Sequence, residues 1–267
     1  MYVDVNEKST EYLSTLEKGL AVLKSFSRER KAMNLTQVAQ VTSLSPAVVR
    51  RCLLTLEHLG YVTKVDSRFS LAPSVLSLAS LFNETYGLDE TIRPALQRLR
   101  ESTGDSASFT VLQSSDVLYL CHVSAERSIR LQANTGTRYP ALVTSTGRCI
   151  LSGLNDQALR AFIESHPPAQ YTHRTTVSGE ALFDKVRAVN RDGYALISDE
   201  LDYGITSLAV PIIIPRRGIV GAINSSAQTQ RINLDDFSVK RAVAVAEAAE
   251  DITKILSAVP DLLDVLS

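Results

Sequence analysis

The sequence is poor in cysteine and contains no long apolar run. Its three cysteines are far apart and form no CxxC pair, which argues against a disulfide framework and favours a reducing compartment. The first twelve residues lack the apolar core of a secretory signal, and no run approaches the ~18 apolar residues of a membrane helix. We therefore expect a cytoplasmic protein without a membrane partner.

An excess of charge of one sign is also missing, since 267 residues carry a net charge of −1. This excludes a polycation that binds nucleic acid along its whole length. Residues 24–72, however, hold eight basic and three acidic residues, a net charge of +5, which leaves −6 for the remainder. A basic segment on a mildly acidic body of globular composition indicates one local anion-binding surface.

Signatures of catalysis are absent as well. The sequence contains no GxSxG, P-loop, GxGxxG or HExxH motif. Cys121 and His122 are neighbours in a predicted strand and so point to opposite faces, which argues against a nucleophile and base pair. His166 and His173 lie seven residues apart in a proline-rich loop, a poor spacing for metal ligands. We expect no enzyme, no metal site and no cofactor.

Three helices are predicted within the first 60 residues. Leucines at spacings of three and four, from Leu13 to Leu23, predict an amphipathic helix over Tyr12–Phe26. The stretch LTQVAQVTSL predicts a short second helix, with Asn34 or Thr36 near its cap. The turn SLS then leads into a third helix over residues 46–59, where a serine can cap the helix and a proline suits its first position.

The third helix has two faces. Its apolar residues at spacings of three and four predict an inward stripe of Val49, Cys52, Leu53, Leu56 and Leu59. The residues left on or near the outer face are Ala47, Val48, Arg50, Arg51, Leu54, Thr55 and His58. Two adjacent arginines therefore flank the outer face of this helix near its N-terminal half.

A small basic hairpin follows this helix. Two strand-like runs, 61–65 and 68–71, carry Lys64 and Arg68 and are joined by an Asp-Ser turn. This order of elements is typical of a winged helix-turn-helix, whose recognition helix lies in the major groove of DNA. The alternative is a small helical subdomain with solvated arginines; the helix order, the SLSP entry and the basic hairpin favour DNA binding.

The pattern changes after residue 104. The alternation in SFTVLQSSDVLYLCHVS predicts a hairpin that turns at 114–116, and SIRLQAN, GYALI, SLAVPIIIP and GIVGAINSSA predict further strands. Helices are predicted in TSTGRCILSGL and over 155–165, 180–190 and 234–256, while 73–99 reads as helix between the two parts. Strands mixed with helices predict an α+β domain with a sheet flanked by helices.

Six stretches in this order resemble the IclR family of bacterial transcriptional regulators: TLEKGLAVLKSF, LTQVAQVTSLSPAVVRRCLLTLEHLGYV, RFSLAPSVLSLA, YPALVTSTGRCILSGL, GYALISDELDYGITSLAVPI and GIVGAINSSA. The resemblance implies a winged helix-turn-helix domain over 1–72, a linker helix over 73–88 and a GAF-like effector-binding domain over 89–267. It also implies a homodimer or a dimer of dimers. YPALVTSTGR and INSSA look similar to the branch that regulates aromatic-acid catabolism, whose effectors include protocatechuate, para-hydroxybenzoate and β-ketoadipate.

The resemblance also implies an effector pocket between the sheet and the start of a helix. The residues carried over by motif are Ser145, Thr146, Gly147, Glu200, Ile205, Ser207, Asn224 and Ser226. Backbone N–H groups at the start of that helix would favour a carboxylate. In the alternative interpretation, the first three residues only cap a helix, and the asparagine and last serine face solvent. Arg148 is expected on the exterior of the helix rather than as a clamp on an anion.

We therefore expect a ligand-responsive transcriptional regulator, either an activator or a repressor, that binds double-stranded operator DNA and senses a small organic acid. That acid is an aromatic acid or its ring-cleavage product. The expected DNA contacts are Thr36, Ser45, Ala47, Val48, Arg50, Arg51, Thr55, Lys64 and Arg68. Two alternatives remain open: a small-molecule-binding enzyme with a helical appendage, and a regulator whose second domain serves only for oligomerisation.

Overall fold

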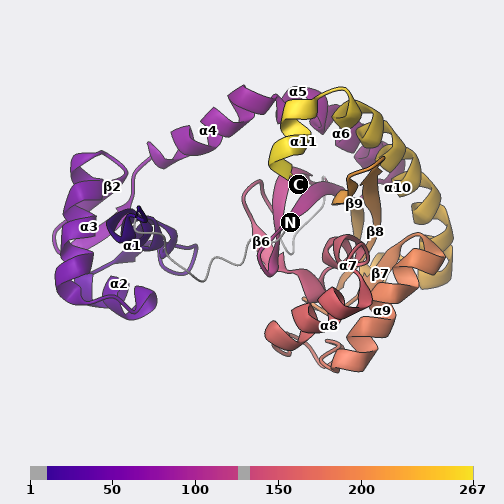
Figure 1. Ribbon diagram of the computed structural model, residues 1–267, viewed down its shortest axis with the longest axis horizontal. Helices are drawn as coiled ribbons and strands as arrows, with labels where there is room; N and C mark the ends of the chain where they lie inside the picture. The colour runs from indigo at the N-terminus through magenta and orange to yellow at the C-terminus, as the bar shows by residue number, and fades with distance from the viewer. Residues whose placement is uncertain (1–10, 126–132, 267) are drawn as a thin grey trace. The chain divides into compact units, whose positions relative to one another are not determined.

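The computed structural model describes residues 11–125 and 133–266, which form two compact units divided between Thr85 and Tyr86 (Figure 1). The predicted strand SIRLQAN falls mostly on 126–132 and lies outside the described residues. None of the described helices is both long and apolar enough to span a membrane. A helix, α4 (Val75–Tyr86), runs through the division, and none of its residues is buried.

The first unit packs three helices against a small antiparallel sheet. Its strands lie in the order β1-β3-β2. The elements are α1 (Ser14–Lys24), β1 (Ala32–Met33), α2 (Leu35–Thr42), α3 (Pro46–His58), β2 (Val62–Val65) and β3 (Arg68–Leu71). Of the two predicted caps of α2, Asn34 is the one used: its side chain accepts from the N–H of Gln37, whose side chain accepts in return. The predicted helices and hairpin are therefore present.

Several details of this unit differ from the predictions. Leu13, Leu16 and Leu20 remain exposed, with Leu13 at 70%, because α1 turns Val22 inward and the core takes Phe26 just beyond its end. On α3, Val49 and the Cys52-Leu53 pair are buried, but Leu59 is 59% exposed because the helix ends at His58. Ser45 stands at the N-cap of α3 without a side-chain cap hydrogen bond.

The second unit is built on a six-stranded antiparallel sheet in the order β6-β5-β4-β9-β8-β7. Its strands are β4 (Ser106–Gln113), β5 (Asp116–Val123), β6 (Arg138–Pro140), β7 (Ala195–Ser198), β8 (Ile205–Ile214) and β9 (Gly218–Gln228). The β4–β5 hairpin turns through Ser114, which has a positive φ of 59°. This confirms the predicted hairpin and the α+β class.

Helices cover both faces of this sheet (Figure 1). On one face α10 (Leu234–Ser257) contacts β8, β9 and α6 (Arg93–Thr103). On the other face α7 (Ser145–Leu151) contacts β8 and β9 and is backed by α9 (Gly179–Asp192), which in turn packs on α8 (Asp156–Ser165). Two short helices, α5 (Leu88–Thr91) and α11 (Pro260–Leu266), complete the unit.

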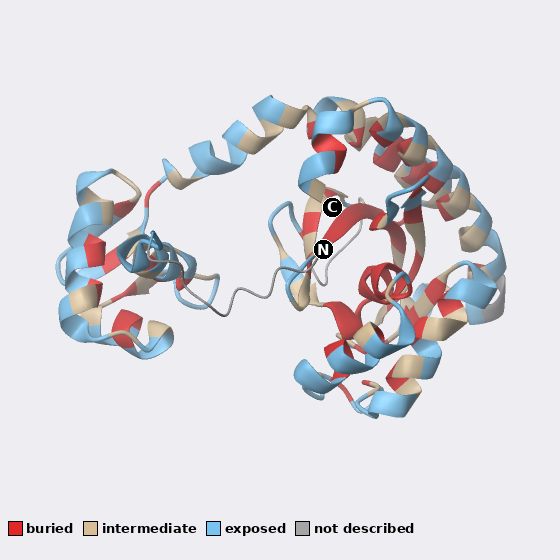
Figure 2. Cartoon of the chain, viewed as in Figure 1, coloured by how far each residue is buried: buried red, intermediate tan, exposed pale blue. Residues whose placement is uncertain are grey.

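The short helix α7 is buried along its whole length (Figure 2). A 3₁₀ turn, η1 (Ala141–Val143), leads into it, and the Thr144 side chain caps it by accepting from the N–H of Gly147. A Cβ on Gly147 would lie 2.1 Å from the carbonyl oxygen of Ala141, so only glycine allows this turn to close onto the helix. The contact fixes the start of α7 against the sheet.

Candidate effector pocket and nucleic-acid interface

All residues predicted to contact DNA belong to the first unit, and most of them are exposed. Val48 is half-buried, and the others are exposed: Thr36, Ser45, Ala47, Arg50, Arg51, Thr55, Lys64 and Arg68. One side of α3 therefore faces solvent (Figure 2), and Arg50 and Arg51 are both exposed. The Thr55 hydroxyl donates to the carbonyl oxygen of Arg51 at 2.9 Å, which leaves its oxygen as the atom available for an outside donor.

In the second unit, strand pairing brings four of the predicted effector residues together. Ser207 on β8 lies directly opposite Ser226 on β9, and Asn224 lies two residues before it on the same face. The Asn224 amide nitrogen donates to both serine hydroxyls, at 2.9 and 3.0 Å, and the two serines are 2.9 Å apart. Ser145, from the start of α7, adds its hydroxyl 2.8 Å from Ser207. With Ile205, these residues line one hollow.

The other three predicted effector residues do not line this hollow. Thr146 is fully buried. The N–H of Gly147 is already taken by the Thr144 side chain at 3.2 Å, so this N–H is not free for a ligand. Glu200 is buried and engaged by other side chains of the protein. The hollow is lined by sheet residues, by the turn before α7 and by the loop after β7, and α7 itself contributes only its first serine.

Arg148 corrects the prediction that it lies on the helix exterior. It is 1% exposed, and its two terminal nitrogens donate to the two carboxylate oxygens of Glu200 at 2.9 and 2.7 Å. Its Nε donates to the carbonyl oxygen of Leu142 at 2.9 Å. The predicted role of Glu200 as an effector ligand is also unsupported, because its carboxylate is bound by Arg148. The two residues are 52 positions apart in the sequence.

Further donors surround the Glu200 carboxylate. The N–H of Thr176 donates to it at 2.9 Å, and the Lys185 ammonium lies 3.2 Å away. Burial by itself raises the pKa of Glu200, but the Arg148 hydrogen bonds and charge, with these two donors, outweigh burial and lower the pKa to about 2. The pair is therefore charged at neutral pH and fastens α7 to the loop after β7.

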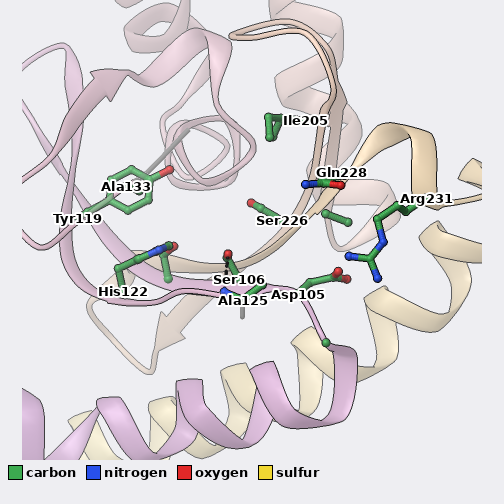
Figure 3. A pocket seen from close by; sticks show the side chains of 13 residues that line it. Asp105, Ser106, Tyr119, His122, Ala125, Ala133, Ile205, Ser226, Gln228 and Arg231 are labelled. Atoms are coloured by element: carbon green, nitrogen blue, oxygen red, sulfur yellow. Dashed lines mark hydrogen bonds between the residues drawn. The ribbon is translucent and has the colours of Figure 1, made fainter. Parts of the chain in front are cut away.

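A second hollow adjoins the first and was missed by sequence reasoning (Figure 3). It is lined by Asp105, by Tyr119 and His122 of β5, and by Arg231 from the 3₁₀ turn η2 (Thr229–Arg231). Tyr119, Ile205 and Ser226 line both hollows and join them. The two hollows enclose about 570 and 410 Å³ of space, including the part open to solvent.

His122 sits in this second hollow with both ring nitrogens in contact with hydroxyls. Nδ1 lies 2.9 Å from the Ser108 hydroxyl and Nε2 lies 3.1 Å from the Ser124 hydroxyl. Burial, and then the charge of Arg93, lower the pKa of His122, so the ring is neutral at neutral pH. The neighbouring Cys121 is buried, and burial raises the pKa of its thiol to about 11. His122 lines the hollow and Cys121 does not, which agrees with the prediction that the two side chains point to opposite faces of the strand.

The chain matches two family models that together span most of it. Residues 15–66 match the IclR helix-turn-helix domain, and residues 84–254 match the model described as bacterial transcriptional regulator IclR C-terminal. Among curated proteins it is 30% identical to the Pca regulon regulatory protein of Pseudomonas putida, over 91% of this chain and 84% of that protein.

Two further comparisons concern aromatic acids. The chain is 29% identical to the p-hydroxybenzoate hydroxylase transcriptional activator of Acinetobacter baylyi, over 84% of this chain and 85% of that protein. Its fold matches a crystal structure of an IclR homolog complexed with 4-hydroxybenzoate from Microbacterium hydrocarbonoxydans, with a TM-score of 0.75 at 20% identity, over 91% and 99% of the two chains. These proteins are regulators, and the enzyme alternative finds no support among them.

Proposed function

The chain belongs to the IclR family of bacterial transcriptional regulators, and on that premise we propose which of its surfaces bind the operator and the effector. It acts on DNA in the cytoplasm as a homodimer or a dimer of dimers, with the α3 helices of two copies in successive major grooves. The proposed functional parts are the basic outer face of α3 and the hollow between α7, β8 and β9.

The DNA-binding surface combines α3 with the wing. Arg50 and Arg51 project from the exposed side of α3, and Lys64 and Arg68 are exposed on β2 and β3. Arginine is suited to guanine edges and to phosphates, whereas lysine binds phosphate as a point charge. We assign base or phosphate contacts to the helix and phosphate contacts that fix register to the wing and to Thr36.

The effector is a small organic acid, and we propose an aromatic acid or its ring-cleavage product. The observation that carries this assignment is the largely buried polar cluster of Ser145, Ser207, Asn224 and Ser226, in a hollow that apolar side chains such as Val143, Ile197 and Leu201 also line. Buried polar groups are costly when they lack partners, and here the side-chain oxygen of Asn224 has none among the described residues. The relatives named above support an aromatic ligand.

The effector acts on operator binding only through its different affinities for the DNA-competent and DNA-incompetent arrangements of the protein. We propose that α4 transmits this difference as the linker, with domain boundaries near residues 72 and 88. The sign of the change distinguishes an inducer from a co-repressor.

Mobility shift with DNA from upstream of the protein's own gene tests the proposal, using a panel of aromatic acids and their ring-cleavage products. We expect a sequence-specific complex whose affinity changes with one class of acid. A specific complex that no acid alters contradicts the effector assignment. Absence of any specific complex at low salt contradicts the assignment of α3 as the DNA-binding surface.

A further inference from the structure

We propose that the two adjoining hollows hold opposite ends of the effector, with an uncharged hydroxyl between Ser145 and Asn224 and a carboxylate on the side of Arg231. The inference rests on the proposed function, since it orients the small acid within the same site. It narrows the effector to an acid whose far end carries a hydroxyl, such as a hydroxyaromatic acid, and disfavours a dicarboxylate ring-cleavage product.

The first step is a count of hydrogens in the polar cluster, where four contacts require four donors. The Asn224 amide nitrogen supplies two, one to Ser207 and one to Ser226. Ser226 donates to Ser207, whose two acceptor positions are then filled, so Ser207 donates to Ser145. With the amide turned round, three serine hydrogens would have to serve four contacts. The amide orientation is therefore fixed by the network.

Two hydrogen-bonding positions of the cluster remain open. The hydroxyl hydrogen of Ser145 has no acceptor among the residues that the structure describes, and the Asn224 side-chain oxygen is buried without a donor. One donor and one acceptor match a hydroxyl group, which accepts from the serine and donates to the amide oxygen. A carboxylate offers only acceptors, so its lone pairs would face those of the Asn224 oxygen.

The charges around the cavity point the same way. Among the described residues lining the hollow of Ser145 and Asn224, the one charged side chain is Asp202, an acid. A ligand carboxylate there would meet a like charge. The Gly147 N–H at the start of α7 is already taken by the Thr144 side chain, so it does not offset this repulsion.

The adjoining hollow has the opposite character. Arg231 lines it, and the guanidinium lies at the same end as Asp105 (Figure 3). The Asp105 carboxylate is paired with Arg241 at 2.7 Å and also feels the charge of Arg231, so two arginines face one carboxylate and the net charge at this end is positive. The ring of His122 is neutral and adds no positive charge. A carboxylate is therefore stabilised at this end, which adjoins the hollow of the serine cluster at the shared Tyr119, Ile205 and Ser226.

Titration calorimetry of the full chain with three ligands tests the orientation. The probes are 4-hydroxybenzoate, benzoate without the hydroxyl, and methyl 4-hydroxybenzoate without the carboxylate. Ser145→Ala should reduce the preference for 4-hydroxybenzoate over benzoate by roughly tenfold and leave the preference for acid over ester unchanged. Arg231→Gln should reduce the preference for the acid over the ester and leave the preference for 4-hydroxybenzoate over benzoate unchanged. Ser165→Ala and Arg216→Gln, at exposed positions outside both hollows, are matched controls that should change neither preference.

Each variant retains one preference, which reports that its pocket is folded. The opposite pairing, in which Ser145→Ala removes the preference for acid over ester, overturns the orientation but leaves acid sensing in place. Binding of β-ketoadipate in place of 4-hydroxybenzoate overturns the hydroxyl assignment in the same way. Failure of every acid tested to bind the wild-type protein overturns the proposed effector function itself, and the inference with it.

Discussion

At the residue scale, the buried pair of Arg148 and Glu200 is the strongest electrostatic feature of the second unit. It is bidentate, almost inaccessible to water and supported by Lys185 and the N–H of Thr176. Such a pair adds little net stability compared with apolar residues of the same shape, but the loss of one partner leaves an uncompensated buried charge. Its role here is to fix the start of α7, which carries Ser145 into the pocket.

Arg148→Met should therefore lower the free energy of unfolding by about 3–5 kcal/mol, because Glu200 is left buried and charged. The double variant Arg148→Met/Glu200→Leu should lose less than Arg148→Met alone. Urea unfolding of the wild type, both single variants and the double variant measures these differences. Additive losses in the double variant would show that the two side chains are not coupled.

The low pKa of Glu200 also predicts a pH dependence of stability. Because the folded pKa is about 2 and the ordinary value is 4.5, the pair contributes fully above pH 4.5, by about 3 kcal/mol, and this is lost as the pH falls towards 2. Glu200→Gln should lack this component. The difference in unfolding free energy between wild type and Glu200→Gln, measured from pH 7 to pH 3, should shrink below pH 4.5; a constant difference contradicts the assignment.

The residue scale is also where sequence reasoning failed most. The family resemblance placed Ser145, Ser207, Asn224 and Ser226 in one pocket, and alternation along the strand put Asn224 and Ser226 on one face. Nothing local indicated that an arginine in the first turn of α7 reaches a glutamate 52 residues later. The second hollow was missed for the same reason, since Arg231 comes from a turn far from β5 in sequence and joins it only in the folded sheet.

At the scale of elements, most helices and strands follow from local patterns. The capping box of α2, the proline at the start of α3 and the alternation in β5 each encode their element directly. The exposed leucines of α1 show the limit of this reasoning, because periodicity identifies an apolar face but not what covers it. The sequence alone does not show which apolar residues of this short helix, Val22 or the leucines, pack into the core.

The close approach of α7 to the preceding turn predicts an effect of substitution at its glycine. Gly147→Ala should lower the unfolding free energy by at least about 2 kcal/mol, because the new Cβ meets the backbone of Ala141. Gly19→Ala, within α1 and without atoms nearby, should instead raise it by about 0.5–1 kcal/mol. Thermal or urea unfolding compares the two; equal effects would show that the turn relaxes freely.

The exposed face of α3 predicts how operator binding responds to substitution. Arg50→Ala should weaken operator binding by about 1–3 kcal/mol if the arginine contacts a base, and relax specificity at one position. If it contacts phosphate, the loss should be similar for all DNA sequences. The slope of the logarithm of the binding constant against the logarithm of the salt concentration should then become shallower by about one. Fluorescence anisotropy over a salt series, with Arg216→Ala as the control, distinguishes these cases; unchanged affinity removes Arg50 from the interface.

At the scale of the whole molecule, the sequence was most informative. Six motifs in order identified a two-part regulator, and both family models match the corresponding regions. The uneven charge predicted one local anion-binding surface on a mildly acidic body, and the order of helices with the basic hairpin predicted that this surface binds DNA. The orientation of the effector was not predictable, because it depends on which hydrogen-bonding positions remain open after the strands pair and α7 packs onto them.

The central claim is that the acid in the second unit and the operator on the first are linked. The most direct test is the affinity of the full-length protein for its acid, measured by calorimetry with and without saturating operator DNA. Linkage predicts that the two affinities differ by the same factor by which the acid changes operator affinity. Equal affinities of the acid for the free and the DNA-bound protein would contradict the account.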